Sequence, residues 1–569
     1  MNGKKLFWVI LGVAFLVRVT GLGYGLPFLY HQDEPIMVNH AMAIGATGDW
    51  NPHFFTNGSL SMYLLFFLYG GLFLFMKLLG QVAGAYDFGI LFLKDPTSFY
   101  ILGRFVLGVL AGTLTVGWLM SRASKLFRVP IGLFAGLFLA LCYFHVQNSH
   151  YIWSDIPLTL AASVLFFQLL TVIRKPSALG FCLAGVAWGV GLACKMTAAF
   201  LAPTLLFALI LSAKGQSADK NLKNALSCGF GALSAFFICS PFAILDWKTF
   251  LAHMILQKNA ETVLSPGFHF VHSLLQGVGP LTLVLSFLGI VPLLKEDKRS
   301  GVLTVFFVAT FYLANSFTGM PFARRVLPLA PILCFLAAWG WVHVSARLSP
   351  GARRLGLGIV LAASLAPIFY SDALFFREDT RTQAFRWVTQ NVPPGTVLVT
   401  DNRFFSPHLT QPAEWIESKK ELLETAASET YITSRDIDKV RAKRLDMMQK
   451  ANEGKPAYRV YALSTLKEGK DLPLFMLPIL PPVAGRILEE KTEYLIFNYA
   501  EYREDFHVLK NAAGLAMERV ASFSPYRSNA QQYSLDSSES TAAPHGLKEL
   551  FSRKSLGPYL EIYRVKQSG

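Results

Sequence analysis

The sequence has 569 residues, of which 53% are hydrophobic and only 16% are charged, with a formal net charge of +15. A soluble domain usually carries about 25% charged residues, so this composition excludes a disordered chain, a disulfide-stapled secreted scaffold and an ordinary cytosolic enzyme. Residues 376–569 hold 27 basic and 25 acidic residues, whereas the first 375 residues hold 25 basic and 12 acidic ones. The basic excess therefore lies beside apolar stretches, as in a multi-pass membrane protein, and does not indicate nucleic-acid binding.

Apolar stretches of about 20 residues, the length that crosses a bilayer as a helix, recur through the first part of the chain. They predict an α-helical polytopic membrane domain over residues 1–375, with roughly 11–13 transmembrane helices. Lys4 and Lys5 precede the first stretch, but no clear small-residue cleavage site follows it, so we expect a retained span. Twelve stretches can be placed, near residues 6–22, 61–80, 99–120, 131–148, 155–173, 178–195, 197–213, 225–245, 276–294, 301–317, 326–345 and 355–375.

Short basic loops predict the orientation of these spans, because such loops face the cytoplasm. Four of them, each two spans from the next, agree with one another and place the C-terminal part outside. The N-terminus is expected in the cytoplasm and residues 23–60 outside, an arrangement that needs an odd number of spans. Twelve is even, so we expect one error, between residues 61 and 148. The four loops contain Arg174-Lys175, Lys214 to Lys223, Lys295 to Arg299 and Arg347 to Arg354.

Two adjacent acids, Asp33 and Glu34, follow the first span, in a part of the chain that has few acids. Carboxylates beside a membrane span are costly to desolvate and are usually functional or paired. One interpretation is a solvated start of the outer loop. The other is a catalytic pair containing a general base whose pKa is set by a partly buried site.

The outer loop continues through residues 51–60, where Pro and Gly punctuate a run in which polar groups alternate with aromatic ones. This pattern is typical of a structured loop, and His53 and Asn57 are its candidates for binding a sugar or an acceptor. Phe54 and Phe55 fit an interfacial aromatic belt equally well.

The next outer turn, residues 148–157, contains three further candidates, His150, Tyr151 and Asp155. Asp155 opens a span that is otherwise free of charge, so its side chain should point to the outer mouth of the bundle. An acid at a helix N-terminus also has a purely structural explanation, and both roles can hold at once. His150 could pair with Asp155 or could be a plain interfacial histidine.

Three cations, Lys195, Arg324 and Arg325, are predicted on the same outer side. Lys195 separates two apolar stretches and could either snorkel to the interface or bind an anion such as a lipid phosphate. Outer loops are poor in arginine, so the Arg324-Arg325 pair needs a reason. Phosphate binding supplies one, because a guanidinium fork matches phosphate oxygens, and a salt bridge to Asp33 or Asp155 is the structural alternative.

The C-terminal part, residues 376–569, is predicted to be a separate extracytoplasmic soluble domain of α/β or α+β class. A helix is expected over residues 382–392, ended by Pro393-Pro394-Gly395, and a polar helix over residues 417–450. The domain contains neither a cysteine nor a catalytic signature, and the chain has no C-x-x-C pair. Strands are expected over residues 396–400, 458–463, 494–499 and 559–565.

Together these segments resemble the bacterial members of glycosyltransferase family 39, the protein mannosyltransferase and aminoarabinose transferase group with the GT-C fold. The resemblance covers residues 5–400, and the order and spacing of its motifs carry it, because each motif is weak alone. Many relatives have a His/Lys-Pro-Pro motif where this chain has Phe55-Thr56-Asn57-Gly58-Ser59, which leaves the acceptor and the donor sugar open. The matching motifs are Asp33-Glu34, the loop into Ser59-Leu60, Arg104, His150 to Pro157, Gly191 to Ala198, Ser240-Pro241-Phe242, Pro321 to Pro331, and Arg386-Trp387-Val388 with Pro393-Pro394-Gly395.

The resemblance implies an inverting transfer of a sugar from a polyprenyl phosphate, undecaprenyl phosphate in a bacterium, at the periplasmic face of the inner membrane. The acceptor would be a lipid, a polysaccharide or a protein, and no metal or other cofactor is expected. Asp33 would be the base, Asp155 would support the acceptor side, and Lys195 with Arg324 would hold the phosphate. The full set of predicted site residues is Asp33, Glu34 and Asp155 for catalysis, Lys195, Arg324 and Arg325 for the phosphate, and His53, Asn57, His150 and Tyr151 for the acceptor or sugar.

Rival interpretations come from other classes of protein. A transporter or flippase for a lipid-linked sugar would place charges near the bilayer midplane, whereas the distinctive charges here are predicted at one face. A sensor or assembly factor whose C-terminal domain binds a partner could coexist with an enzyme. A metal site formed by His31, Asp33, Glu34 and His53 is a further alternative, although nothing in the sequence fixes its geometry.

Overall fold

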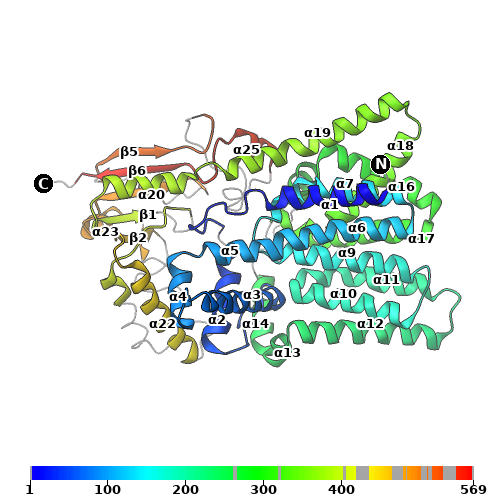
Figure 1. The fold of residues 1–569 in the computed structure, drawn as a ribbon, viewed down its shortest axis with the longest axis horizontal. Helices are drawn as coiled ribbons and strands as arrows, with labels where there is room; N and C mark the ends of the chain where they lie inside the picture. Colours follow the sequence, from blue (N-terminus) through cyan, green and yellow to red (C-terminus); the bar gives the residue numbers. More distant parts are fainter. Residues whose placement is uncertain are drawn as a thin grey trace.

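The computed structural model has a helical bundle at one end and a β-sheet at the other, with a layer of further helices between them (Figure 1). The N-terminus lies at the end of the bundle that is remote from the sheet. The residues that the structure describes are 3–31, 33–259, 266–317, 322–400, 405–417, 435–463, 479–481, 483–500, 509, 515–528 and 546–566.

The bundle packs around α18 (Ala330–Ser345), in which every residue from Ala330 to Trp341 is buried. Helix α16 approaches α18 closely, since a Cβ atom at Gly340 would lie 2.1 Å from the carbonyl oxygen of Leu285. The other helices of the bundle are α1 (Gly3–Val19), α6 (Ala111–Leu126), α7 (Val129–Ala140), α9 (Asp155–Val172), α10 (Ala178–Cys194), α11 (Ala202–Ala213), α12 (Ala218–Cys239), α16 (Pro280–Glu296), α17 (Lys298–Ser316) and α19 (Pro350–Phe375), with short segments α5 (Thr97–Gly103), η1 (Arg104–Leu110), α8 (Tyr143–Asn148), η2 (Met196–Leu201), α15 (Pro266–Phe268), η3 (His269–Val278) and η4 (Ala323–Leu329).

Seven described helices are long and apolar enough to cross a membrane by length and composition, or eight if the bent pair Pro266–Val278 and Pro280–Glu296, which turns by 101°, is one span. The expected stretches at 61–80, 99–120, 155–173, 197–213, 225–245, 326–345 and 355–375 correspond to these seven. The expected stretch at 131–148 divides into α7 and α8, and α1 and α10 have 17 residues each. Such a helix is about 26 Å long at 1.5 Å per residue, slightly less than the hydrocarbon core.

Basic loops gather at the end of the bundle that is remote from the sheet, together with the N-terminus (Figure 1). Ion pairs join them there, between Arg128 and Glu296 and between Arg174 and Asp297, each at 2.7 Å. The turn after α6 therefore lies at this end with the other basic loops, a placement that loop charge alone left undecided.

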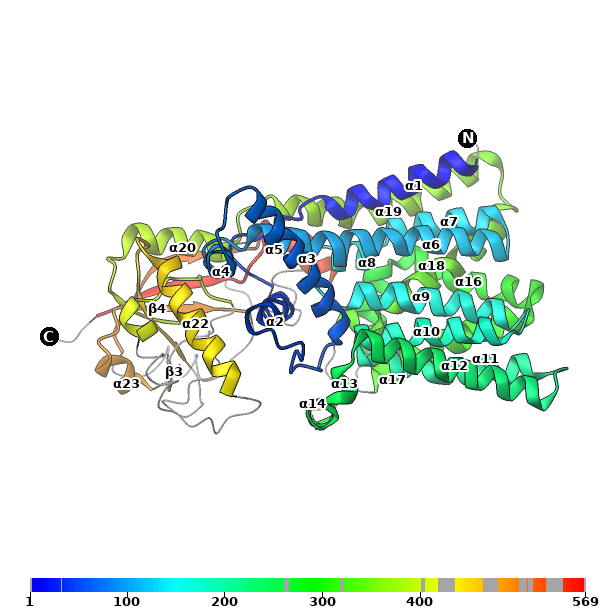
Figure 2. The ribbon, with the colours of Figure 1, turned by 60° about the horizontal axis from the view of Figure 1, so that its bottom comes forward.

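Helix α3 (Ser59–Leu78) belongs to the layer between the bundle and the sheet (Figures 1 and 2). It begins beside the sheet-facing end of α10, where the Gly58 backbone N–H donates to the carbonyl oxygen of Cys194 at 3.0 Å. The chain then leads to α4 (Ala85–Lys94), whose Tyr86 hydroxyl donates to Asp446 of α22 (Arg435–Asn452). Helix α3 thus starts and continues on the sheet side of the bundle, although its length and composition would also suit a membrane span. The layer also contains α2 (Glu34–Thr47), α13 (Phe242–Leu245) and α14 (Trp247–Asn259).

The C-terminal part forms a six-stranded sheet in the order β3-β2-β1-β4-β6-β5. The first four strands in this order run parallel to one another, and β6 and β5 add antiparallel partners. Helix α20 (Thr380–Asn391) packs Ala384 and Val388 against one face of the sheet, and α23 (Ala484–Glu489) packs Ile487 against the other. The strands are β1 (Val397–Thr400), β2 (Arg459–Leu463), β3 (Ile479–Leu480), β4 (Tyr494–Asn498), β5 (Met517–Phe523) and β6 (Leu560–Val565), and α25 (Leu547–Ser552) precedes β6.

The expected elements of this part agree closely with the observed ones where the structure describes them. Helix α20 begins two residues before the predicted residue 382, and β1, β2, β4 and β6 lie within the four predicted strands. The polar helix expected over residues 417–450 is observed as α22, which starts at Arg435, and residues 418–434 lie outside the described residues. Strands β3 and β5 were not predicted.

Candidate active site

Four charged side chains from distant parts of the sequence meet at the sheet-facing end of the bundle. Arg324 Nη2 donates to Asp33 Oδ2 at 2.9 Å, and Arg324 Nε lies 3.7 Å from Asp155 Oδ2. Lys195 Nζ donates to both carboxylate oxygens of Asp155, at 2.9 Å each. These four residues are called the charged cluster below.

The four members sit where regular helices begin, end or break. Asp33 and Asp155 lie at the starts of α2 and α9, and Lys195 is in extended conformation between α10 and the 3₁₀ helix η2. Arg324 belongs to η4, a second 3₁₀ segment, which leads into α18. Backbone groups at helix ends lack intrahelical partners, so the polar side chains gather where the bundle already exposes polar groups.

Trp153 lies beneath the two cations of the cluster. The guanidinium carbon of Arg324 lies 4.3 Å from the ring centre of Trp153, and Lys195 Nζ lies 5.6 Å from it. The His31 ring, two residues before Asp33, lies 6.2 Å from the same ring. A cation over an aromatic face gains about 0.5–2 kcal/mol, more when it is desolvated, so Trp153 helps to hold both cations in place.

Burial differs among the members of the cluster. The Asp155 side chain is 1% exposed, Arg324 7% and Lys195 12%, whereas Asp33 is 20% exposed. Arg325, which follows on η4, is half-buried and acts electrostatically on Lys195. The two carboxylates of the charged cluster and the three cations Lys195, Arg324 and Arg325 sum to a net charge of +1, and Asp33 is more exposed than Asp155.

Glu34 lies next to Asp33 in sequence but belongs to a different, fully buried arrangement. Its carboxylate receives two hydrogen bonds from Arg104, at 2.8 and 2.7 Å, and a third from the Ile152 backbone N–H at 2.8 Å. Burial alone would raise the pKa of Glu34, but the charge and hydrogen bonds of Arg104 keep that pKa below its usual value. Glu34 is therefore placed as an ion-pair partner that fixes the start of α2 against η1.

His150 and Tyr151 face inward from the turn before α9. His150 Nε2 is hydrogen-bonded to the Thr20 carbonyl oxygen at 2.9 Å and lies 3.9 Å from Asp372, so this nitrogen faces Thr20 and Asp372 rather than Asp155. The Tyr151 ring is 4% exposed and packs on the His31 ring, with 4.5 Å between ring centres. The structure brings Tyr151 near the Asp33 segment but leaves little of its surface for a ligand.

Asn57 and His53 separate, although both belong to the outer loop. Asn57 is buried beside Gly58, which packs so closely on the end of α10 that a Cβ atom there would lie 1.9 Å from the Ala193 carbonyl oxygen. Asn57 is thus next to the segment that carries Lys195. His53 pairs instead with Asp49 at 2.8 Å and lies 3.9 Å from Asp246, at the start of α14.

A metal site made of His31, Asp33, Glu34 and His53 does not match this geometry. Glu34 is occupied by Arg104, His53 by Asp49, and Asp33 by Arg324. Within the described ranges, no group of three or more His, Cys, Asp and Glu side chains is placed to hold a metal ion.

Sequence reasoning assigned no role to Trp153 and named Arg104 only as part of a family motif. Trp153 stands between two candidates, Tyr151 and Asp155, in a turn already singled out, so an aromatic flanked by site residues was the available signal. Arg104 is a lone cation inside an apolar stretch, a pattern that indicates a buried carboxylate partner, here Glu34.

Comparisons with known proteins agree with this architecture. Residues 98–245 match the family described as dolichyl-phosphate-mannose-protein mannosyltransferase, a segment that includes Arg104, Asp155 and Lys195. A comparison with curated protein sequences gives no match.

Among solved structures, the chain is similar to ArnT from Cupriavidus metallidurans in the apo state, with 14% identity, a TM-score of 0.50, and 92% of this chain and 97% of that chain covered. The same protein bound to undecaprenyl phosphate gives 14% identity and a TM-score of 0.50, with 91% and 96% covered. The resemblance found in the sequence is thus confirmed: the chain is a multi-pass membrane protein with the GT-C glycosyltransferase fold, related over residues 98–245 to the dolichyl-phosphate-mannose-protein mannosyltransferases.

Proposed function

We propose that the protein transfers a sugar from a polyprenyl-phosphate donor to a lipid, polysaccharide or protein acceptor on the outer side of a bacterial inner membrane, with inversion at the anomeric carbon. The observation that carries this proposal is the charged cluster, in which an accessible carboxylate lies within 2.9 Å of a cation at the end of an apolar bundle. In this proposal residues 1–375 hold the donor, and residues 376–569 form the extracytoplasmic domain.

Asp33 is the proposed base. Its carboxylate accepts the proton of the acceptor hydroxyl or amine while the acceptor atom attacks the anomeric carbon. The bond between that carbon and the phosphate oxygen breaks, and its electron pair leaves with the phosphate. A phosphodiester monoanion thereby becomes a phosphomonoester dianion.

Charge balance supports this assignment of roles. Counted as two carboxylates and three cations, the resting site has a net charge of +1, which matches the monoanionic donor. After Asp33 takes a proton the site has a net charge of +2, which matches the dianionic product. Cations already placed where charge develops stabilise the departing group without reorganising during the reaction.

Lys195, Arg324 and Arg325 are the proposed phosphate ligands. Arg324 is paired with Asp33 in the structure, and one guanidinium group has enough N–H donors to bind a phosphate and a carboxylate at the same time. The ArnT structure bound to undecaprenyl phosphate has the same fold, which supports a donor of this class. Asn57, beside the Lys195 segment, is the best placed of the proposed acceptor or sugar ligands.

A deletion strain tests the proposal. Lipids, glycans and membrane proteins from the deletion strain and from strains complemented with the wild type or with Asp33→Asn are compared by mass spectrometry. We expect a sugar modification to be missing, and a polyprenyl-phosphate sugar to accumulate, in the deletion and Asp33→Asn strains. Identical profiles in all strains would contradict the proposal, and a sugar lipid stranded on the cytoplasmic leaflet would instead indicate a flippase.

A further inference from the structure

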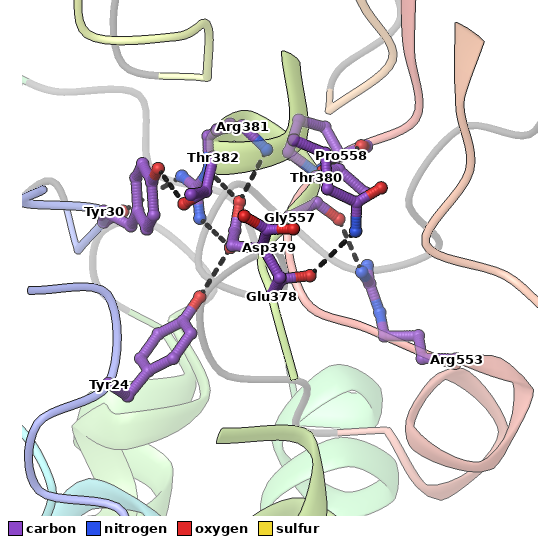
Figure 3. Close-up of polar contacts among 11 residues, drawn as sticks. Tyr24, Tyr30, Glu378, Asp379, Thr380, Arg381, Thr382, Arg553, Gly557 and Pro558 are labelled. Atoms are coloured by element: carbon purple, nitrogen blue, oxygen red, sulfur yellow. Dashed lines mark hydrogen bonds and ion pairs between the residues drawn. The ribbon is translucent and has the colours of Figure 1, made fainter. Parts of the chain in front are cut away.

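A buried polar junction joins the start of the C-terminal part to the chain that leads to Asp33 (Figure 3). Asp379 caps α20 by accepting from the Arg381 backbone N–H, and its carboxylate also receives the Arg381 Nε and Nη2 hydrogens at 2.9 and 2.8 Å. The Tyr24 hydroxyl donates to the same carboxylate at 2.7 Å. Arg381 is fully buried, and Asp379 is 3% exposed.

Arg381 also contacts Tyr30, which precedes Asp33 of the charged cluster by three residues. Its Nη1 donates to the Tyr30 carbonyl oxygen at 3.2 Å, and its guanidinium carbon lies 3.9 Å from the centre of the Tyr30 ring. The Tyr30 hydroxyl is hydrogen-bonded to Thr382 Oγ1 at 2.6 Å. Two neighbouring residues of α20 therefore hold one tyrosine by its backbone, its ring face and its hydroxyl.

The opposite side of the junction is fixed to the sheet. The Thr380 backbone N–H donates to the Leu556 carbonyl oxygen at 3.0 Å, and its hydroxyl donates to the Pro558 carbonyl oxygen at 2.7 Å. Gly557 has a positive φ of 94°, and a Cβ atom there would lie 2.1 Å from Thr380 Oγ1, so the turn before β6 closes tightly on α20. The start of α20 thus contacts the turn before β6 through Thr380 and the Tyr30 backbone through Arg381.

Tyr30 is three residues before Asp33 in the sequence. His31 packs on Tyr151, and the Asp33 backbone N–H reaches His31 Nδ1 at a long 3.4 Å. The Asp33 side chain is the most exposed member of the charged cluster. Asp33 is thus flanked by the Tyr30 backbone, which Arg381 holds, and by the Glu34 ion pair, and Arg324 contacts its carboxylate directly.

We propose that Arg381 is a positioning residue, through which the C-terminal domain holds the Tyr24–Tyr30 segment ahead of Asp33 so that the Asp33 carboxylate faces the donor and acceptor. This inference rests on the proposed function for Asp33. The C-terminal domain would then affect the reaction without touching the substrate, because it holds the segment that positions Asp33. A misplaced reacting group loses rate in the chemical step, so kcat should fall more than donor binding weakens.

The test uses purified full-length protein with Arg381→Lys, which keeps the charge but removes the fork. Arg386→Lys is the matched control, because Arg386 lies on the same helix and pairs with Glu378 at 2.7 Å on the exposed side. Tyr30→Phe removes the contact with Thr382 alone and should give a smaller effect of the same kind. Amide hydrogen exchange of residues 24–36 and steady-state transfer are measured for each.

Arg381→Lys should raise amide exchange in residues 24–36 while exchange in α9 stays as in the wild type. It should also lower kcat about 10-fold, with the donor KM within about 2-fold of the wild type. Unchanged exchange in residues 24–36, or raised exchange with an unchanged kcat, would overturn the inference. The exchange measurement needs no turnover, so a wild-type protein that transfers no sugar would refute the proposed function while exchange still decides whether Arg381 holds the segment.

Discussion

The two ends of the helical bundle both carry ion pairs between arginines and acids, but in different surroundings. At the basic end, Arg128 and Glu296 are 50% and 42% exposed, and Arg174 and Asp297 are 27% and 26% exposed. At the sheet-facing end, the Glu34–Arg104 pair and Asp155 are almost completely buried. The ion pairs at the two ends have similar distances but differ in exposure, so we expect them to contribute differently to stability.

Solvent explains the difference. Exposed pairs are screened and pay side-chain entropy, so they stabilise by about 0–1 kcal/mol. Removing one partner of a buried pair leaves an uncompensated charge and costs about 3–5 kcal/mol. The basic end is thus suited to fixing the orientation of loops, whereas the sheet-facing end concentrates charge where water is scarce and a phosphate would be bound strongly. The predictions below test this contrast.

The largest effect is expected for Asp33→Asn. Loss of a general base lowers the rate by about 10²–10⁴-fold, and the asparagine is close enough in shape to preserve insertion and folding. Transfer is measured with purified protein, and Asp87→Asn on the exposed surface of α4 is the control. Turnover at the wild-type rate in Asp33→Asn would remove Asp33 from the mechanism.

Arg104→Ala should destabilise the protein by about 3–5 kcal/mol, because it leaves the Glu34 carboxylate buried without its cation. The folded-state pKa of Glu34 lies below its unfolded value, so this pair stabilises the fold above the unfolded pKa and the stabilisation is lost as pH falls through the folded pKa. Thermal unfolding in detergent against pH measures both effects. A variant with wild-type stability at neutral pH would show that the pair contributes little.

Lys195→Ala should raise the donor KM about 10–100-fold, with a smaller change in kcat, because a cation is lost from the proposed phosphate site. Arg324→Ala should act in the same direction. Steady-state kinetics with a varied polyprenyl-phosphate sugar provide the measurement, and thermal unfolding identifies any variant that has merely lost its fold. If donor KM is unchanged in both folded variants, these cations serve the structure alone.

Arg128→Ala at the basic end should change the free energy of unfolding by no more than about 1 kcal/mol and should leave transfer unaffected. The same unfolding and transfer assays apply. A loss as large as that of Arg104→Ala would show that exposure does not separate the two ends.

Much of the fold was readable from local signals. Helix α20 and strand β1 were placed within two residues, because Pro393-Pro394-Gly395 ends one and precedes the other. Strand β5 was missed, since its middle residues are exposed and its sequence MERVASF lacks a buried alternating face. The composition of α3 satisfies the test for a membrane span, whereas its position in the layer between the bundle and the sheet depends on tertiary contacts.

The sequence predicted which charged residues form the site, but it predicted their ion-pair partners less completely. The expectation that Asp33, Lys195 and Arg324 converge is met by the ion pairs of the charged cluster, and both salt bridges offered as the structural alternative for Arg324 are present. The adjacent acids have different partners: Asp33 pairs with Arg324, and Glu34 pairs with Arg104. Consecutive side chains at the start of a helix point in different directions, which separates the two carboxylates. Sequence alone does not reveal such a division, since it depends on where Arg104 and Arg324 lie in space.

The most direct test of the central claim is a single-turnover measurement with the protein in liposomes. A polyprenyl-phosphate sugar carrying a heavy isotope is supplied with membrane acceptor, and mass spectrometry follows both free polyprenyl phosphate and the labelled acceptor. We predict equal release of both products by the wild type, release about 10²–10⁴-fold slower by Asp33→Asn, and retained donor binding in that variant. Wild-type protein that binds the donor but releases no polyprenyl phosphate, or that moves the intact sugar lipid across the bilayer, would contradict the account.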